Sequence, residues 1–332
     1  MPKVTVLMAV YNGEEHLREA IESILGQAFR DFEFLIIDDA STDSTREIIL
    51  SRADPRIRLL KNETNLGLTK SLNIGLKAAT GEYVARMDAD DVSLPERLER
   101  QAAYLDGNPG DALVGSLADV IGEDSQLISK PLGPAPNRGM IYVRLAFSNV
   151  MAHSSAMFRR SVVEKLGGYD ESFPQSQDYD LWYRVSRSCG VRILNLVLLK
   201  WRTTPSAISE KSGESQRVCA KRIFVKHVRE VMPAISDRAL ERLIRYHEGL
   251  VLWATPADLV AFWRYLRSVQ KERRALFQRL GFVSARRING ETLNGFVADL
   301  KGFMAIGLPG LSRKLGAAWR RIRFHKRKRA TI

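Results

Sequence analysis

Alternation between strand-like and helix-like segments limits most strongly how this chain can fold. Four apolar runs, rich in valine, isoleucine and leucine, are separated by segments whose apolar residues recur with helical spacing. The expected strands are residues 4–10, 32–37, 57–60 and 82–87. Strands that alternate with helices in this way form a parallel sheet with helices on both faces. The sequence therefore predicts an α/β fold.

Polar residues follow each of these four expected strands. They are Tyr11 and Asn12, Asp38 and Asp39, Asn65, and the acidic cluster of Asp88, Asp90 and Asp91. In open α/β sheets, ligands bind beyond the carboxyl ends of the strands. We therefore expect the four loops to converge on one crevice.

The acidic cluster places three carboxylates within four residues, Asp88 to Asp91. Like charges this close repel one another, and a hard divalent cation relieves the repulsion most simply. Mg²⁺ is usually held by one or two carboxylates, with phosphates of a substrate completing its shell. The alternative is a solvated acidic turn, because aspartate is common in turns. The position of the cluster after a strand favours the metal site.

The chain after the acidic cluster continues the α/β pattern and then changes. Pro95 begins a helix, Gln177 opens another, and strands are expected at 112–121, 126–129, 155–158 and 191–201. Residues 203–215 are rich in Ser, Thr and Pro, which is typical of a boundary. The pattern beyond them is mainly helical. We predict one domain over residues 1–209, with two halves meeting at 110/111, followed by a helical region over 210–332.

Composition excludes several classes of protein. The chain has 332 residues, of which 45% are hydrophobic and 27% charged, as in an ordinary globular protein. No stretch approaches the ~18 consecutive apolar residues that a membrane span needs. The N-terminus lacks the pattern of a secretion signal, so we expect a cytoplasmic protein. The two cysteines, Cys189 and Cys219, do not make a disulfide framework.

The formal net charge of +13 is concentrated toward the C-terminus, because no acidic residue follows Asp299. Residues 313–329 mix Lys and Arg with Leu315, Trp319, Ile322 and Phe324. This mixture predicts an amphipathic helix at an anionic membrane surface. Such a helix would make the protein peripheral on the inner face of the cell membrane. The alternative is a solvated basic tail.

Five motifs occur in one order along residues 2–209. They are Ala9-Val10-Tyr11-Asn12-Gly13, Ile37-Asp38-Asp39-Ala40-Ser41-Thr42-Asp43, Asn65-Leu66-Gly67-Leu68, Thr80-Gly81-Glu82-Tyr83 before Asp88-Ala89-Asp90-Asp91, and Gln177-Asp178-Tyr179-Asp180-Leu181-Trp182. A chain with these motifs resembles the inverting glycosyltransferases of family 2. The resemblance implies a GT-A fold, a Rossmann-like, mixed and mostly parallel sheet between helices. It makes residues 1–110 the half that binds a nucleotide-diphosphate sugar and residues 111–209 the acceptor half.

The resemblance places the donor at the strand-end loops. It implies that Asp39 accepts a hydrogen bond from uracil, that Tyr11 packs against this base and that Asp88 reaches the ribose. Ala9 and Asn65 complete this set of donor-binding residues. A carboxylate is a good hydrogen-bond acceptor for the N–H groups at the edge of a base. The alternative for Tyr11 is a buried core aromatic.

Asp90 is the metal ligand that the resemblance implies, with Mn²⁺ or Mg²⁺ as the cofactor. Such an ion neutralises charge on a diphosphate leaving group. Asp38 is better explained as a strand-end or cap residue than as a ligand. Asp91 is explained as the start of the turn toward Pro95.

Asp178 matches the base that inverting transfer requires, since a carboxylate must take the proton of the attacking hydroxyl. The family usually has Glu or Asp before it, whereas this chain has Gln177, which leaves no second carboxylate there. The alternative for Asp178 is a helix cap. Trp182 is better explained as a core residue, and His153 as a structural histidine.

Arg202 lies in a late loop where, by the resemblance, an arginine meets the diphosphate. The histidine often found two residues later is replaced by Thr204, so no further metal ligand is inferred there. The function expected is transfer of a sugar, from a UDP-sugar in particular, to a glycan or polyprenyl-linked acceptor in surface polysaccharide synthesis.

Two alternatives to this function remain. One is a catalytically inactive protein that only binds a nucleotide sugar. The other is a nucleic-acid-binding protein that uses its basic tail. No recognised nucleic-acid motif occurs, and strand-end carboxylates repel phosphate. We therefore expect no nucleic acid as a partner.

Overall fold

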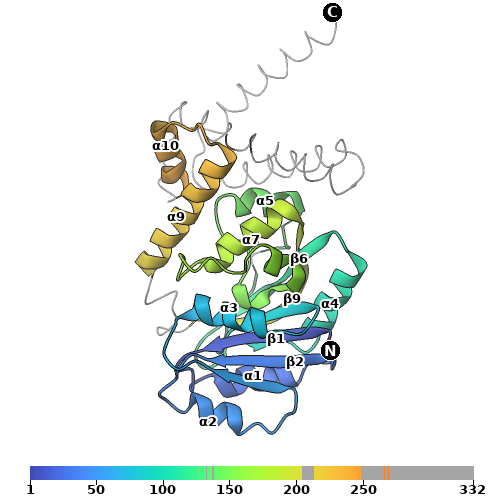
Figure 1. The fold of residues 1–332 in the computed structure, drawn as a ribbon. Helices are drawn as coiled ribbons and strands as arrows, with labels where there is room; N and C mark the ends of the chain where they lie inside the picture. The colour runs from blue at the N-terminus through green and yellow to red at the C-terminus, as the bar shows by residue number, and fades with distance from the viewer. Residues whose placement is uncertain (132, 137, 204–212, 248–264, 266–267, 269–332) are drawn as a thin grey trace, which may run out of the picture.

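A mixed sheet forms the centre of the computed structural model, which describes residues 1–131, 133–136, 138–203, 213–247, 265 and 268. Among these residues, nine strands form one sheet in the order β3-β2-β1-β4-β8-β6-β9-β5, with β7 paired to β6. The strands are β1 (Val4–Val10), β2 (Phe32–Asp38), β3 (Ile57–Lys61), β4 (Tyr83–Met87), β5 (Val92–Ser93), β6 (Asp111–Ile121), β7 (Leu127–Ser129), β8 (Met157–Arg159) and β9 (Gly190–Arg202). Figure 1 shows the sheet enclosed by helices.

The first four strands are parallel, as the sequence predicts. Residues of β1, β2 and β4 are buried on both faces, which explains their continuous apolar runs. One face packs against α3 (Leu68–Ala78). The other face packs against helices on which every third or fourth residue is buried, namely α1 (Leu17–Leu25), α2 (Thr45–Leu50) and α4 (Arg97–Gly107).

The second half of the sheet is partly antiparallel. Strand β8 pairs antiparallel with both β4 and β6, while β6 and β9 are parallel. The expected strand at 155–158 begins later, because His153–Ser155 forms a 3-10 turn, η1. The two-residue strand β5 was not predicted from the sequence and pairs with β9. Helices α5 (Arg138–Leu145), α6 (Arg160–Lys165) and α7 (Gln177–Ser188) belong to this half.

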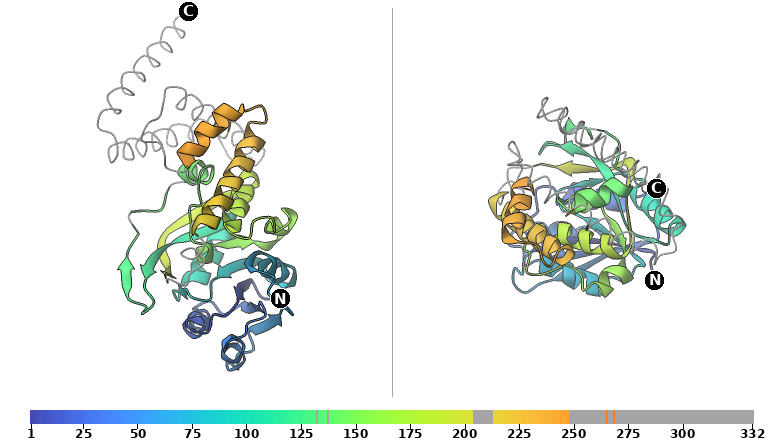
Figure 2. Two further views of the ribbon diagram at one scale, coloured as in Figure 1. Left: turned by 90° about the vertical axis from the view of Figure 1, so that its left-hand side faces the viewer. Right: turned by 90° about the horizontal axis from the view of Figure 1, so that it is seen from above.

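Two further helices, α9 (Gly213–Val231) and α10 (Asp237–His247), follow the predicted boundary. Figures 1 and 2 show α9 alongside α7 from three directions. Phe224 and Val228 of α9 pack with Tyr183 of α7 in a separate apolar cluster. Apart from Tyr265 and Ser268, the rest of the predicted helical region, including the basic tail, lies outside the described residues. No helix within the described ranges is long and apolar enough to cross a membrane.

A buried charge cluster fixes α9 to α7. Asp180 is fully buried and accepts hydrogen bonds from Arg184 at 2.6 Å and Lys226 at 2.9 Å. Lys226 also reaches Asp170 at 3.0 Å. Burial alone would raise the pKa of Asp180, but the His227 ring, whose Nε2 atom is 3.5 Å from the carboxylate, and the hydrogen bonds and charges of Arg184 and Lys226 hold this pKa well below its ordinary value. The contact between the two helices therefore depends on an ionised Asp180.

Asp180→Ala is expected to lower the free energy of unfolding by about 1.5–3 kcal/mol, because the half-buried Arg184 and Lys226 lose a charged hydrogen-bond acceptor. Urea denaturation followed by circular dichroism measures this loss. Asp237→Ala is the control, since its ion pair with Arg229 is exposed and exposed pairs add little stability. Equal midpoints for the two variants would contradict the proposed role of Asp180.

Candidate active site

The carboxyl ends of β1, β2 and β4 meet at one edge of the sheet. Val10 is opposite Asp38, and Met8 is opposite Met87, in parallel register. The loops that begin at Tyr11, Asp39 and Asp88 therefore start side by side. This edge is where the sequence predicts a crevice.

Tyr11 has an exposed fraction of 49%, so it is not the buried core aromatic that the sequence left open. Its ring is available to a ligand above the edge of the sheet. Ala9, in contrast, is buried within β1 and packs in the core beside Leu35 and Ile37. A contact between Ala9 and the donor stays a prediction.

Asp39 is buried and shapes the loop that carries the exposed Asn65. One carboxylate oxygen accepts hydrogen bonds from the Asn62 amide at 2.7 Å and the Leu66 backbone N–H at 2.9 Å. The other accepts the Gly67 backbone N–H at 2.9 Å and keeps capacity for a further donor. This organising role was missed from the sequence, because the loop lies more than twenty residues further along the chain.

Asp38 points the other way and accepts the backbone N–H of Ser41 at 2.9 Å. It is therefore a strand-end turn residue, as predicted from the sequence. Ala40 beside it has a φ of 64°, and Asn12 on the neighbouring loop has a φ of 49°. The Thr42 backbone N–H donates to the Asn12 side chain at 2.8 Å. Such strained backbone persists only where its surroundings hold it in place.

The three carboxylates of the acidic cluster have different environments. Asp91 is buried, accepts the backbone N–H of Arg202 at 2.8 Å, and accepts the hydroxyl of Ser154. Asp88 is half-buried, accepts the same hydroxyl at 2.9 Å and forms an ion pair with the buried Arg86. Asp91 is thus a structural anchor, more than the start of a turn.

Asp90 is half-buried beside Asp88. Burial, followed by the charge of Asp88, raises the pKa of the Asp90 carboxyl to about 6. A cation at this position would relieve that repulsion. Within the described residues, no group of three or more His, Cys, Asp or Glu is arranged to hold a metal. One or two carboxylates completed by phosphates of a substrate fit this donor set better than an all-protein cage.

Arg202 is buried, and each of its three side-chain nitrogens donates to protein. The Nε atom donates to the Asp90 backbone carbonyl at 2.7 Å, and Nη2 donates to Glu19 at 2.5 Å. The Nη1 atom reaches the carbonyls of Gly122 and Glu123. Arg202 therefore positions the backbone of Asp90. The predicted contact with a diphosphate would need one of these bonds to be exchanged, and it stays a prediction.

Asp178 lies in the first turn of α7 and does not cap this helix. One carboxylate oxygen accepts the Tyr179 backbone N–H at 2.8 Å, and the other accepts the Asn149 amide at 2.5 Å. Burial raises the pKa of Asp178 to about 6, while its hydrogen bonds and the charge of Arg86 limit the rise. The charge of Asp88 also raises this pKa. Asp178 and the acidic cluster, 90 residues apart in sequence, therefore lie within electrostatic reach of each other.

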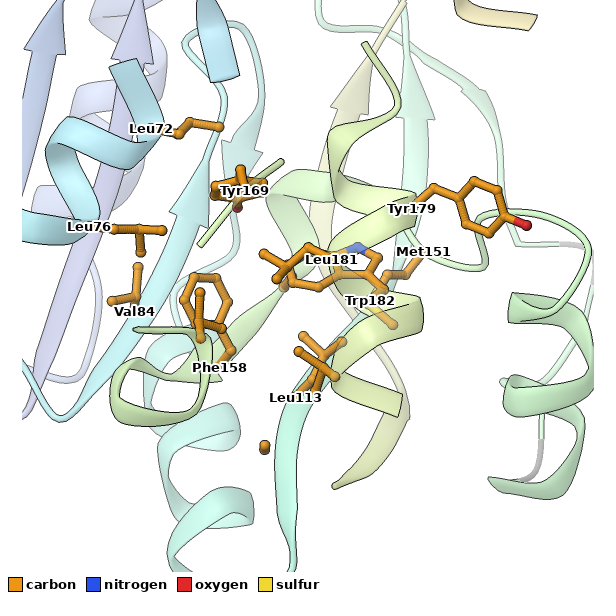
Figure 3. Packing of buried hydrophobic residues seen from close by; sticks show 14 of the residues in the cluster. Leu72, Leu76, Val84, Leu113, Met151, Phe158, Tyr169, Tyr179, Leu181 and Trp182 are labelled. Atoms are coloured by element: carbon orange, nitrogen blue, oxygen red, sulfur yellow. The ribbon is translucent and has the colours of Figure 1, made fainter. Parts of the chain in front are cut away.

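Trp182 and His153 belong to the core below Asp178. Trp182 is fully buried and packs among Met151, Leu181 and Phe158, as Figure 3 shows. His153 lies edge-on to Trp182, and its Nε2 atom is 2.8 Å from the Tyr169 hydroxyl. Burial lowers the pKa of His153 well below its ordinary value, so its ring is neutral. Both residues have structural roles, as predicted from the sequence.

The sequence matches a family of known proteins. Residues 5–167 match the family described as "Glycosyl transferase family 2". The chain is 38% identical to the putative glycosyltransferase EpsE of Bacillus subtilis over 218 residues, which cover 64% of this chain and 77% of EpsE. The chain belongs to glycosyltransferase family 2. It is an enzyme of the transferase class.

Another relative of this glycosyltransferase is named an O-antigen biosynthesis glycosyltransferase, WbnJ of Escherichia coli. It is 34% identical over 225 residues, covering 65% of this chain and 85% of WbnJ. The crystal structure of S. aureus TarS in complex with UDP-GlcNAc aligns with a TM-score of 0.59 at 19% identity. That alignment covers 82% of this chain and 83% of the TarS chain, which comprises TarS residues 1–349. The likeness confirms the predicted GT-A fold.

Asp39→Ala is expected to loosen the loop at Leu66 and Gly67, because both backbone N–H groups lose a charged acceptor. A hydrogen bond to a charged group contributes about 1.5–3 kcal/mol, so exchange of these two amides should accelerate about tenfold or more. Amide hydrogen exchange followed by NMR measures the change. Asp43→Ala, on the same strand-end loop, is the control and should leave both amides as in the wild type. Unchanged exchange in Asp39→Ala would refute this role.

Proposed function

We propose that this glycosyltransferase is inverting and metal-dependent, and that it transfers a sugar from a UDP-sugar to a glycan or lipid-linked acceptor. The observation that carries the proposal is that the charge of Asp88 raises the pKa of both Asp90 and Asp178, so that both carboxylates lie near Asp88. Asp90 would hold the cation at the leaving diphosphate, and Asp178 would accept the proton of the attacking hydroxyl. The names of WbnJ and of the TarS complex support surface polysaccharide as the product and UDP-sugar as the donor.

The donor end uses the strand-end loops. Tyr11 is free to pack against the base, and the remaining acceptor capacity of Asp39 suits an N–H of uracil. Asp88, which contacts Ser154 and Arg86, would reach the ribose. Asp90 would hold Mn²⁺ or Mg²⁺, which would supply positive charge to the diphosphate.

The acceptor end uses Asp178 as general base. The acceptor oxygen forms a bond to the anomeric carbon while the bond from this carbon to the diphosphate breaks, and Asp178 takes the hydroxyl proton. Attack opposite the leaving group inverts the anomeric configuration. A base with a pKa of about 6 is mostly ionised at neutral pH and is still basic enough to accept a proton.

Two variants separate binding from chemistry. Asp90→Ala should abolish the rise in melting temperature that UDP with Mn²⁺ gives the wild type, because the ion loses its protein ligand. Asp178→Asn should keep this rise but lower sugar transfer by about 10²–10⁴-fold, the usual contribution of a general base. Glu99→Gln, an exposed change on α4, is the control and should match the wild type in both assays. Identical behaviour of all three variants would refute the proposal.

The pH dependence of kcat/KM should report Asp178. Because its pKa is raised to about 6, the base is protonated and inactive at lower pH, so kcat/KM should fall tenfold per pH unit below about pH 6. Asn149→Ala removes a hydrogen bond that favours the charged carboxylate, so this acid limb of the pH profile should move to higher pH. A limb that stays in place in Asn149→Ala would contradict the assignment.

A further inference from the structure

A cavity of about 370 Å³ lies where the start of α7 meets the start of α9. This volume falls in the range of small-molecule sites, about 300–1,000 Å³. Its lining includes Asn149, Ser176, Asp178, Tyr179, Gln216 and Arg217. The Ser176 hydroxyl donates to the Gln216 backbone carbonyl at 3.4 Å, which joins the two helix starts. The wall from α9 lies beyond residues 5–167 that match the family.

The position of Asp178 determines what this cavity receives. A general base lies within about 2.6–3.2 Å of the proton that it removes. The attacking hydroxyl must therefore enter the cavity that Asp178 lines, and the rest of the acceptor must contact the other walls. This step rests on the proposed function, since it takes Asp178 as the base.

Arg217 is an exposed cation in that wall. Arginines nearby have partners, such as Arg184 with Asp180 and Arg187 with Glu230. Arg217 has no ion pair or hydrogen bond to any described residue. Apart from Asp178, it is the only charged residue among those described around the cavity. A guanidinium stays charged at all physiological pH values and binds phosphate through two parallel hydrogen bonds.

Tyr179 gives a second, independent indication of a ligand. It is 1% exposed and lines the cavity, and its hydroxyl has no hydrogen-bond partner among the described residues. Figure 3 shows its ring directed away from Trp182 and the core around it. A buried hydroxyl without a partner is uncommon in folded proteins. The hydroxyl oxygen is enclosed in this structure, so a sugar hydroxyl would supply the missing partner once the wall moves slightly to admit it.

We propose that this cavity is the acceptor site and that Arg217 selects an acceptor sugar carrying a phosphate or diphosphate group. Asp178 faces the attacking hydroxyl, Tyr179 contacts the sugar, and Arg217 contacts the phosphate. Helix α9 thereby sets acceptor specificity from outside the family match. The phosphate belongs either to a lipid-linked diphosphate sugar or to a soluble sugar phosphate.

The test compares three acceptors built on one hexose, using the full chain with Mn²⁺ and a UDP-sugar. They are the alkyl diphosphate, the 1-phosphate and the neutral alkyl glycoside. The wild type should show a KM about tenfold or more lower for at least one phosphate-bearing acceptor than for the glycoside, as expected for a charge-assisted hydrogen bond. The acceptor that is preferred identifies the source of the phosphate.

Arg217→Gln should abolish this preference, and Arg217→Lys should retain part of it. Arg229→Gln removes the same charge from another position on α9 and should keep the preference. A loss of folding would lower turnover of all three acceptors together, so the ratio of KM values separates recognition from stability. An unchanged ratio in Arg217→Gln would overturn the proposal.

Inhibition of donor hydrolysis by the 1-phosphate gives a readout that needs no transfer. Its inhibition constant should rise about tenfold in Arg217→Gln. A wild type with neither phosphate preference nor such inhibition would also overturn the proposal. Failure of the proposed function would appear differently, because Asp178→Asn would then transfer sugar as fast as the wild type.

Discussion

The buried carboxylate of Asp91 joins three segments that are far apart in the chain. It accepts the backbone N–H of Arg202 in β9 and the hydroxyl of Ser154 before β8. The next two residues pair with β9 as strand β5. Arg202 in turn holds the carbonyl of Asp90 and the carboxylate of Glu19 in α1. The acidic loop is therefore fixed to both halves of the sheet, and the places of Asp88 and Asp90 depend on it.

Desolvated charges and strained backbone, which both oppose folding, occur together at this site. Arg86 is buried beneath the cluster, and its guanidinium nitrogens make no hydrogen bond within the described residues although the group pairs with Asp88. Desolvation of such groups opposes folding unless partners compensate for it. Strained backbone occurs at Asn12 and Ala40 in the strand-end loops, and at Ser176, two residues before Asp178, with φ 56°. Strain and perturbed pKa values cluster where proteins bind ligands and catalyse reactions.

Short-range patterns in the sequence predicted the parallel strands, because β1, β2 and β4 are buried on both faces and their composition reports that burial. They did not predict β5, since two residues carry no periodicity, or the antiparallel direction of β8, since composition does not encode direction. Trp182 could be assigned to the core from residue type alone. The hydrogen bonds of Asp91 and the burial of Arg202 could not be predicted from residue type, because their partners are distant in sequence.

The sequence by itself determined the α/β class, the strand-end loops and the set of carboxylates, since each depends on residue type and local spacing. Only the tertiary structure decided how those carboxylates divide their roles. The side chains of Asp38 and Asp39 point in opposite directions although the residues are neighbours. Asp90 and Asp91 are also neighbours, but Asp90 is half-buried whereas Asp91 is buried. Burial and partners set these differences. They arise when β9, Ser154 and the loop of residues 62–67 come together at the edge of the sheet.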